Sequence, residues 1–128
     1  MLKKIILLTA LFSSIHSLQA SAAEEIQGWT FMTSTNEFNY YVKNGSLKEK
    51  QNTRVMLIQQ VPISQTSNSN VSYKRFSLPL QACKDEYGEI TMYDLGGRVV
   101  AKMDYVKGGS SAAAFMGDII CLNPDKRI

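Results

Sequence analysis

The chain contains only two cysteines, Cys83 and Cys121, and this pair restricts its possible folds more than any other feature. In a small exported domain two cysteines most often form a disulfide, with free or intermolecular thiols as the alternatives. A bond between them would close a long loop, for which the chain-entropy relation gives about 4 kcal/mol of stabilisation. We therefore predict a structural disulfide, provided that the chain enters an oxidising compartment.

The start of the chain has the composition of a secretory signal. Lys3 and Lys4 form a positive n-region, Ile5 to Phe12 is apolar, and Ala20 to Ala22 fits a cleavage site. The apolar run is too short to span a bilayer, and the polar residues after it argue against the alternative of a signal anchor. No cysteine lies near the cleavage point, so we expect no lipid anchor.

These features predict a signal peptide over residues 1–22 and one domain over residues 23–128. The whole chain has 14 basic and 11 acidic residues, and removal of the two signal lysines leaves 12 against 11, a net charge of +1. A nucleic-acid-binding domain would carry a larger basic excess, so we expect no nucleic-acid partner. The sole histidine, His16, leaves with the signal, and two thiols without histidine do not suit zinc. We expect no metal and no cofactor.

Most of the mature chain has the composition of β-strands. The expected strands cover Gly28–Thr33, Phe38–Val42, Thr53–Ile63, Val71–Leu80, Tyr87–Tyr93 and Arg98–Val106. Asn44-Gly45 and Gly96-Gly97 predict tight turns, and both glycines of the second pair are expected to adopt positive φ. Pro62 should end its strand or place it at an edge. The period of two leaves open on which face Cys83 lies.

One helix is expected after the strands. Ser110 is a plausible N-cap, and the residues that share one helical face are Ala113, Met116, Gly117, Ile120 and Cys121. Glycine inside a helix costs about 1 kcal/mol relative to alanine, so Gly117 predicts the close approach of another backbone. Pro124 prevents further extension. The fold class is therefore α+β, with an antiparallel sheet of about five to six strands and a C-terminal helix on one sheet face.

No group of side chains predicts catalysis, so we expect no enzyme. Asp85, Glu86, Glu89 and Asp94 could be imagined as an acid pair, but charges beside a hairpin usually form a solvated rim. Ser110-Ser111 follows two glycines, and a helix cap explains it better than a nucleophile does, since no histidine is available to activate it.

The candidate contact surface combines aromatic and basic side chains, which are enriched at binding hot spots. Its members are Tyr73, Lys74, Arg75, Tyr40 and Tyr41. The alternative for each is an ordinary strand position or a core aromatic. Trp29 is expected in the core, and the polar loop Ser64–Asn70 is a further contact candidate.

Several short motifs occur in an order that resembles the surface-adhesin protein E-like domain. They are Gly28-Trp29, Tyr40-Tyr41-Val42, Cys83-Lys84, Tyr93-Asp94, Gly97-Arg98-Val99-Val100, Gly109-Ser110 and Ile119-Ile120-Cys121. The resemblance covers nearly all of the mature chain. It implies a curved antiparallel sheet of about six strands, with a C-terminal helix tied to one face by a disulfide between Cys83 and Cys121. The named adhesin is lipid-anchored, whereas this chain lacks the acceptor cysteine.

The resemblance implies a non-catalytic exported protein that contacts host matrix or envelope components. The absence of a lipid-acceptor cysteine favours a soluble periplasmic location in a Gram-negative bacterium, with secretion or surface association as alternatives. A second hypothesis is a secreted inhibitor of lysozyme or of a protease, because rigid disulfide-linked β domains suit preorganised loops. Oligomeric state stays open, and the strand near Pro62 or the N-terminal strand are the expected edges for pairing with a second copy.

Overall fold

The computed structural model describes residues 23–64 and 70–122. The described elements, in chain order, are β1 (Trp29–Ser34), β2 (Phe38–Lys43), β3 (Lys48–Lys50), β4 (Thr53–Pro62), β5 (Ser72–Pro79), α1 (Leu80–Asp85), β6 (Tyr87–Tyr93), β7 (Val99–Val106) and α2 (Ala112–Ile120). The predicted signal peptide, Pro124 and most of the loop Ser64–Asn70 lie outside the described residues.

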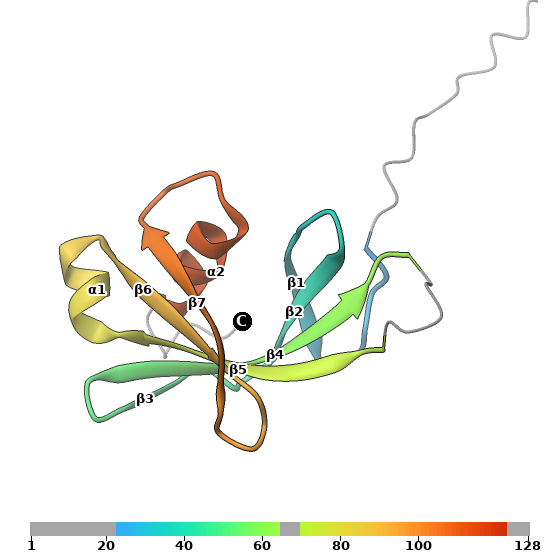
Figure 1. The fold of residues 1–128 in the computed structure, drawn as a ribbon, viewed down its shortest axis with the longest axis horizontal. Coiled ribbons are helices and arrows are strands. Elements are labelled where there is room, and N and C mark those ends of the chain that lie inside the picture. Colours follow the sequence, from blue (N-terminus) through green and yellow to red (C-terminus); the bar gives the residue numbers. More distant parts are fainter. Residues whose placement is uncertain (1–22, 65–69, 123–128) are drawn as a thin grey trace, which may run out of the picture.

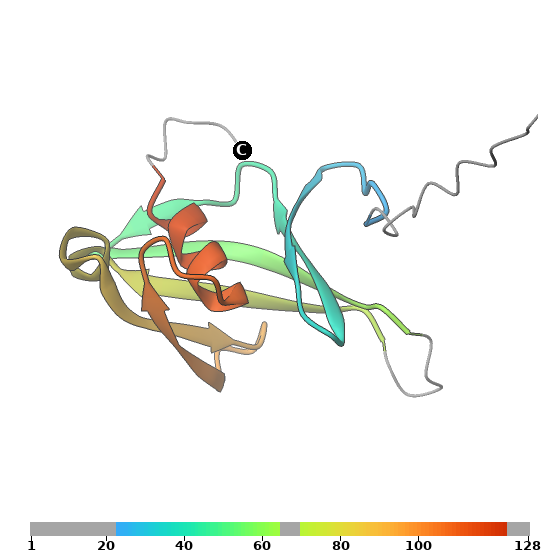
Figure 2. The ribbon, with the colours of Figure 1, turned by 90° about the horizontal axis from the view of Figure 1, so that it is seen from above.

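All strands belong to one antiparallel sheet with the order β1-β2-β4-β5-β6-β7. The short strand β3 pairs with the first residues of β4, and β2 pairs with the last residues of β4. The sheet is strongly curved, and α2 lies within the curve (Figures 1 and 2). The α+β class and the antiparallel sheet with a C-terminal helix are confirmed.

The inner face of the sheet, which α2 covers, carries the hydrophobic core. Alternation along each strand sends one residue in two to this face. The fully buried side chains include Val42, Met56, Ile58, Phe76, Leu78, Ile90, Tyr105, Met116 and Ile120. The opposite face, here called the outer face, carries Leu57, Tyr73 and Arg75 on the two central strands. Curvature around one short helix therefore concentrates nearly all apolar packing on one side.

Contact between α2 and β7 depends on Gly117. A Cβ atom at this position would overlap the ring of Tyr105 on β7, and Tyr105 is only 2% exposed. The close approach at Gly117 is thus confirmed, but the partner is an aromatic ring and not another backbone. Glycine is needed here for its lack of a side chain, which lets the helix lie flat on the ring.

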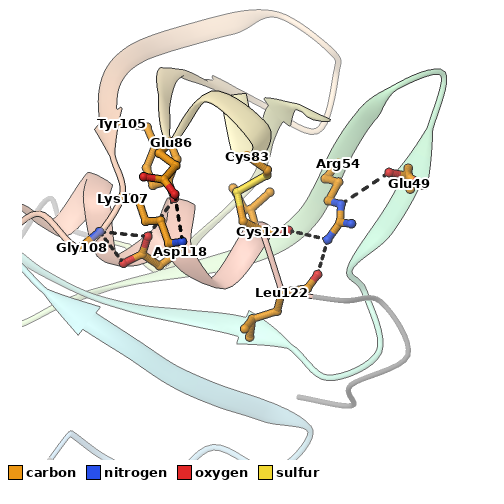
Figure 3. The surroundings of a disulfide bond; sticks show 11 residues. Glu49, Arg54, Cys83, Glu86, Tyr105, Lys107, Gly108, Asp118, Cys121 and Leu122 are labelled. Carbon is orange, nitrogen blue, oxygen red and sulfur yellow. Dashed lines mark hydrogen bonds and ion pairs between the residues drawn. A yellow bond between two sulfur atoms is a disulfide. The ribbon is translucent and has the colours of Figure 1, made fainter. Parts of the chain in front are cut away.

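The disulfide Cys83–Cys121 is present and joins the two helices, as Figure 3 shows. Its Cα atoms are 5.5 Å apart. Cys121 is the C-cap of α2, and Arg54 of β4 donates from Nη1 to the carbonyl oxygens of Ile120 (3.4 Å) and Leu122. A cation at the negative end of the helix dipole is favourable. The disulfide and the Arg54 guanidinium therefore stabilise the same end of α2.

Four local details differ from the sequence predictions. Leu80 and Cys83 belong to α1 and not to a continuing strand, because Pro79 has no N–H for the ladder and its fixed φ suits a helix start. The N-cap of α2 is Ser111, whose Oγ accepts from the Ala114 N–H (3.0 Å), and not Ser110. Ala113 packs against the core as predicted, and Ala114 beside it is buried as well.

The other two differences concern turns and strand order. In the turn between β6 and β7 only Gly97 has a positive φ, because Asp94 closes the turn with its backbone and carboxylate. Pro62 ends β4, as predicted, but β4 lies in the middle of the sheet, so Pro62 marks no edge.

Replacement of Gly117 by alanine tests the contact with Tyr105. Overpacking costs about 1–3 kcal/mol, and the better helix propensity of alanine offsets about 1 kcal/mol. We expect Gly117→Ala to lower the free energy of unfolding by roughly 1 kcal/mol in urea titrations. In a Tyr105→Leu background, which removes the ring, the same change should be neutral or stabilising; an equal loss in both backgrounds would contradict the account.

Removal of the disulfide tests its share of the stability. The cysteines are 38 positions apart, and the chain-entropy relation gives about 4 kcal/mol for such a loop. We expect the double variant Cys83→Ser, Cys121→Ser to lose most of that amount in urea titrations. A loss below about 1 kcal/mol would show that the denatured chain is not restrained as this relation assumes.

Candidate binding site

A groove of about 600 Å³ crosses the outer face of the sheet. Its lining comes from the strands β1 to β5 and from the turns that follow β2 and β6. The lining residues are Trp29, Lys43, Asn44, Gly45, Ser46, Lys48, Val55, Leu57, Tyr73, Arg75 and Leu95. We refer to this hollow as the outer groove.

The outer groove exists because β2 and β3 do not form one continuous strand. Residues 44–47 leave the sheet between them, so Met56 and Leu57 of β4 have no strand partner on this side. The Ser46 Oγ accepts the backbone N–H of Leu57 (3.1 Å) and so replaces the missing strand partner. The groove floor keeps its hydrogen bonds although the ladder is interrupted above it.

Aromatic rings form one wall of the outer groove. Trp29 of β1 contacts Tyr73 of β5 with ring centroids 5.7 Å apart. Both rings are only partly covered, and Tyr73 is 42% exposed. Large rings of this kind offer much contact area with few rotatable bonds, which favours recognition of a partner.

The charged side chains of the outer groove have one sign. Among the described residues that line it, Lys43, Lys48 and Arg75 are basic and none is acidic. The Arg75 Nη1 donates to the Leu95 carbonyl oxygen (3.2 Å), which fixes the guanidinium beside the turn between β6 and β7. Like charges around a hollow with apolar walls make the local potential more positive, which is favourable for anionic groups.

The structure divides the predicted contact residues into three sets. Tyr73 and Arg75 line the outer groove. Lys74 lies between them in the sequence and therefore points to the inner side, in the same alternating set as Phe76. Tyr40 and Tyr41 are 7% and 1% exposed, so they are not available as contact residues. The prediction of a contact role for these two tyrosines is wrong, because both side chains are buried.

Each buried tyrosine is held by a hydrogen bond. Tyr40 lies in the inner core, and its hydroxyl accepts from Gln60 Nε2 (3.2 Å). The Tyr41 hydroxyl donates to the Glu24 carbonyl oxygen (2.7 Å), so the segment before β1 covers it. The residue type alone therefore does not show whether an aromatic side chain in a strand is buried or exposed.

Sequence reasoning missed part of the outer groove. Trp29 was expected in the core but lies half-buried at the groove wall. Lys43, Lys48 and Leu95 were not singled out, because the interruption between β2 and β3 brings them together from separate elements. The Asn44-Gly45 turn signal is the one sequence feature that marks this interruption.

The four acidic residues considered in the sequence do not converge on one site. Asp85 accepts from Gln81, Glu86 pairs with Lys107, Glu89 pairs with Lys102, and Asp94 closes a turn. Within the residues that the structure describes, no group of three potential ligand side chains could hold a metal ion. None of the described helices has the length and apolar character needed to cross a membrane.

A second hollow of about 390 Å³ lies beside the disulfide. There the Tyr105 hydroxyl donates to Asp118 Oδ1 (2.8 Å), and the Gly108 N–H also donates to the Asp118 carboxylate (Figure 3). Burial first, and then the nearby Asp118 carboxylate, raise the pKa of Tyr105 well above its ordinary value. These hydrogen bonds connect β7, α2 and the loop between them, so the group of Tyr105, Gly108 and Asp118 has a structural role.

Comparison with protein-family models, with curated proteins and with solved structures found no match. The resemblance to the surface-adhesin protein E-like domain therefore stays a prediction from the sequence motifs.

Alkaline pH tests the environment of the buried tyrosines. Burial raises the pKa of Tyr40, Tyr41 and Tyr105, so in the folded protein these groups stay protonated above the ordinary tyrosine pKa of about 10. The unfolded chain loses these protons first, so the stabilisation is full below about pH 10 and is lost as pH rises further. We expect Tyr105→Phe to flatten this decline in urea titrations between pH 8 and 11, and an unchanged slope would contradict the account.

Proposed function

We propose that this chain is an exported, non-catalytic binding protein of the bacterial envelope that uses its outer groove to hold an acidic segment of a protein partner. The observation that carries the proposal is the combination of three basic side chains with a partly exposed Trp29–Tyr73 pair in one hollow. Tryptophan, tyrosine and arginine are the residue types most enriched at binding hot spots.

The shape of the groove favours an extended peptide. Its floor is formed by paired strands, so it is preorganised and loses little conformational entropy on binding. Val55, Leu57 and Leu95 provide apolar contacts between the charges. A segment with alternating carboxylate and apolar side chains would satisfy both parts of this surface.

The position of α2 on the inner face leaves the outer face of the sheet for binding a partner. The inner face is filled by α2 and the core, whereas the outer groove has no described element above it. The disulfide suits an oxidising compartment, which supports export as part of the proposal. The motif resemblance to a matrix-binding adhesin points to the same class of function.

Trp29 allows binding to be measured directly, because it is the only tryptophan of the chain. The oxidised protein is titrated with a peptide of alternating glutamate and leucine and with a glutamine-for-glutamate version of it. We expect the Trp29 emission to respond to the acidic peptide only. A third titration uses heparin, a polyanionic glycan. If the Trp29 emission responded to heparin but not to the acidic peptide, the proposal of a protein partner would be wrong.

Arg75→Ala and Lys74→Ala form a matched pair for this assay. The two residues are adjacent in β5 but lie on opposite faces of the sheet. Loss of a charge-assisted contact costs about 1.5–3 kcal/mol, so Arg75→Ala should weaken binding by roughly tenfold or more. Lys74→Ala should leave it nearly unchanged, and equal effects of both variants would contradict a site in the outer groove.

Inhibition of lysozyme or of a protease stays a separate prediction of the sequence. An inhibitor of this kind inserts a projecting loop, and residues 65–69 of the expected contact loop lie outside the described residues. Residual activity of a lysozyme and protease panel in the presence of the oxidised protein checks it.

A further inference from the structure

The strand β7 ends the sheet, and its outer edge carries no further strand in the part of the chain that the structure describes. Figure 2 shows it at the margin of the molecule. Three of its valines, Val99, Val100 and Val106, are about half exposed or more. An exposed apolar strand edge is a template for pairing with another chain unless it is blocked.

The backbone of β7 is oriented for such pairing. The Lys107 N–H donates to the Glu86 carbonyl oxygen (2.9 Å), which directs the groups of Lys107 toward β6. Since successive residues alternate, the N–H and C=O groups of Lys102, Asp104 and Val106 point away from β6. The Val106 carbonyl oxygen agrees with this direction, but it already accepts from the Gly109 N–H (3.1 Å), so Lys102 and Asp104 are the residues that offer groups for pairing.

The sequence of β7 is complementary to itself when read in the opposite direction. In an antiparallel pair centred on Met103, Lys102 lies opposite Asp104 of the second copy, and Val100 lies opposite Val106. The charge pair and the valine pair each occur twice, because the axis is twofold. In this register Lys102 and Asp104 are also the residues whose outward backbone groups would exchange hydrogen bonds.

Among the residues that the structure describes, Asp104 of β7 has no ion-pair partner. Asp104 lies opposite Glu89 of β6 in the ladder, an unfavourable pair of like charges. Lys102 pairs with Glu89 at 3.8 Å, and no ion pair among the described residues includes Asp104. A second copy would place Lys102 directly opposite Asp104 and supply the missing cation.

We propose that two copies of this chain associate through β7, antiparallel and centred on Met103, to form one continuous sheet. The pairing leaves the groove residues Tyr73 and Arg75, on β5, outside the contact between the copies. This inference therefore goes beyond the proposed binding function and does not depend on it.

The other expected edges are less suitable. β4, which contains Pro62, is paired on both sides and offers no edge. β1 is an edge strand, but its register shifts between Phe31 and Thr33, and Met32 turns into the core at that point. A bulge in the middle of an edge strand discourages pairing, whereas the shift in β7 falls near its start, where Val100 has no partner on β6, and leaves the stretch from Ala101 to Val106 regular.

Charge reversal tests the proposed register by sedimentation velocity of the oxidised protein over a range of concentrations. Lys102→Asp and Asp104→Lys each place like charges opposite one another twice, so each should raise the dimer dissociation constant about tenfold or more. The double variant, which exchanges the two charges, should restore the wild-type value. Lys50→Asp, the same change on an exposed residue of β3, serves as the control and should have no effect.

Three results would overturn the proposal. They are a wild-type protein that stays monomeric at every concentration, single reversals that leave the dimer unchanged, and a double variant that folds but does not dimerise. Far-UV circular dichroism establishes folding in each case.

A cross-link gives a second readout that does not depend on charge. Met103 lies opposite its own copy in a non-hydrogen-bonded pair, where Cα atoms are about 4.5 Å apart, close enough for a disulfide. Met103→Cys should therefore give a covalent dimer on mild oxidation. Ala101→Cys, which lies opposite Tyr105 of the second copy in this register, should not, and equal cross-linking of both variants would contradict the register.

Discussion

The packing of α2 into the curve of the sheet is the constraint on which the other features depend. The helix has nine residues, which is too short for stability in water on its own. Contacts with separate parts of the chain hold it: Ser111 caps its start, the Tyr105 ring receives Gly117, and Arg54 and the disulfide hold its end. Without this helix the core residues of four or more strands would face water.

Placement of α2 decides what each side of the sheet can do. The inner face is covered by α2 and the hydrophobic core. A surface that binds a partner must therefore lie on the outer face, in the turns or at the strand edges. On the outer face the interruption between β2 and β3 opens a hollow with a rigid floor. Basic side chains from three strands then give that hollow a single sign of charge.

Local patterns in the sequence predicted most of the architecture, but not β3, α1 or the order of the strands. Period-two alternation, the glycine turns and the small-residue helix face predicted the sheet, the hairpin of β6 and β7, and α2, and the cysteine pair predicted the bond between Cys83 and Cys121. They failed where a residue's environment depends on a distant segment. Tyr41 looks like a surface aromatic until the segment before β1 covers it, and α1 could not be separated from a strand because Pro79 permits both a strand end and a helix start.

The candidate site could be predicted only in part for the same reason. Tyr73 and Arg75 were found because an aromatic residue and basic residues stand next to one another in the sequence, but the same signal also selected Lys74, which lies on the inner side. Trp29, Lys48 and Leu95 come from three other segments, and only the three-dimensional fold brings them to the same hollow.

The central claim is that the sheet has a closed inner face and a binding outer face, and methyl NMR spectroscopy tests it most directly. Val55 and Leu57 lie on the outer side of β4, whereas Met56 and Ile58 lie on its inner side. On addition of the acidic peptide, the account predicts shifts of the Val55 and Leu57 methyl signals while those of Met56 and Ile58 stay in place. Shifts at Met56 and Ile58, with Val55 and Leu57 unchanged, would contradict it.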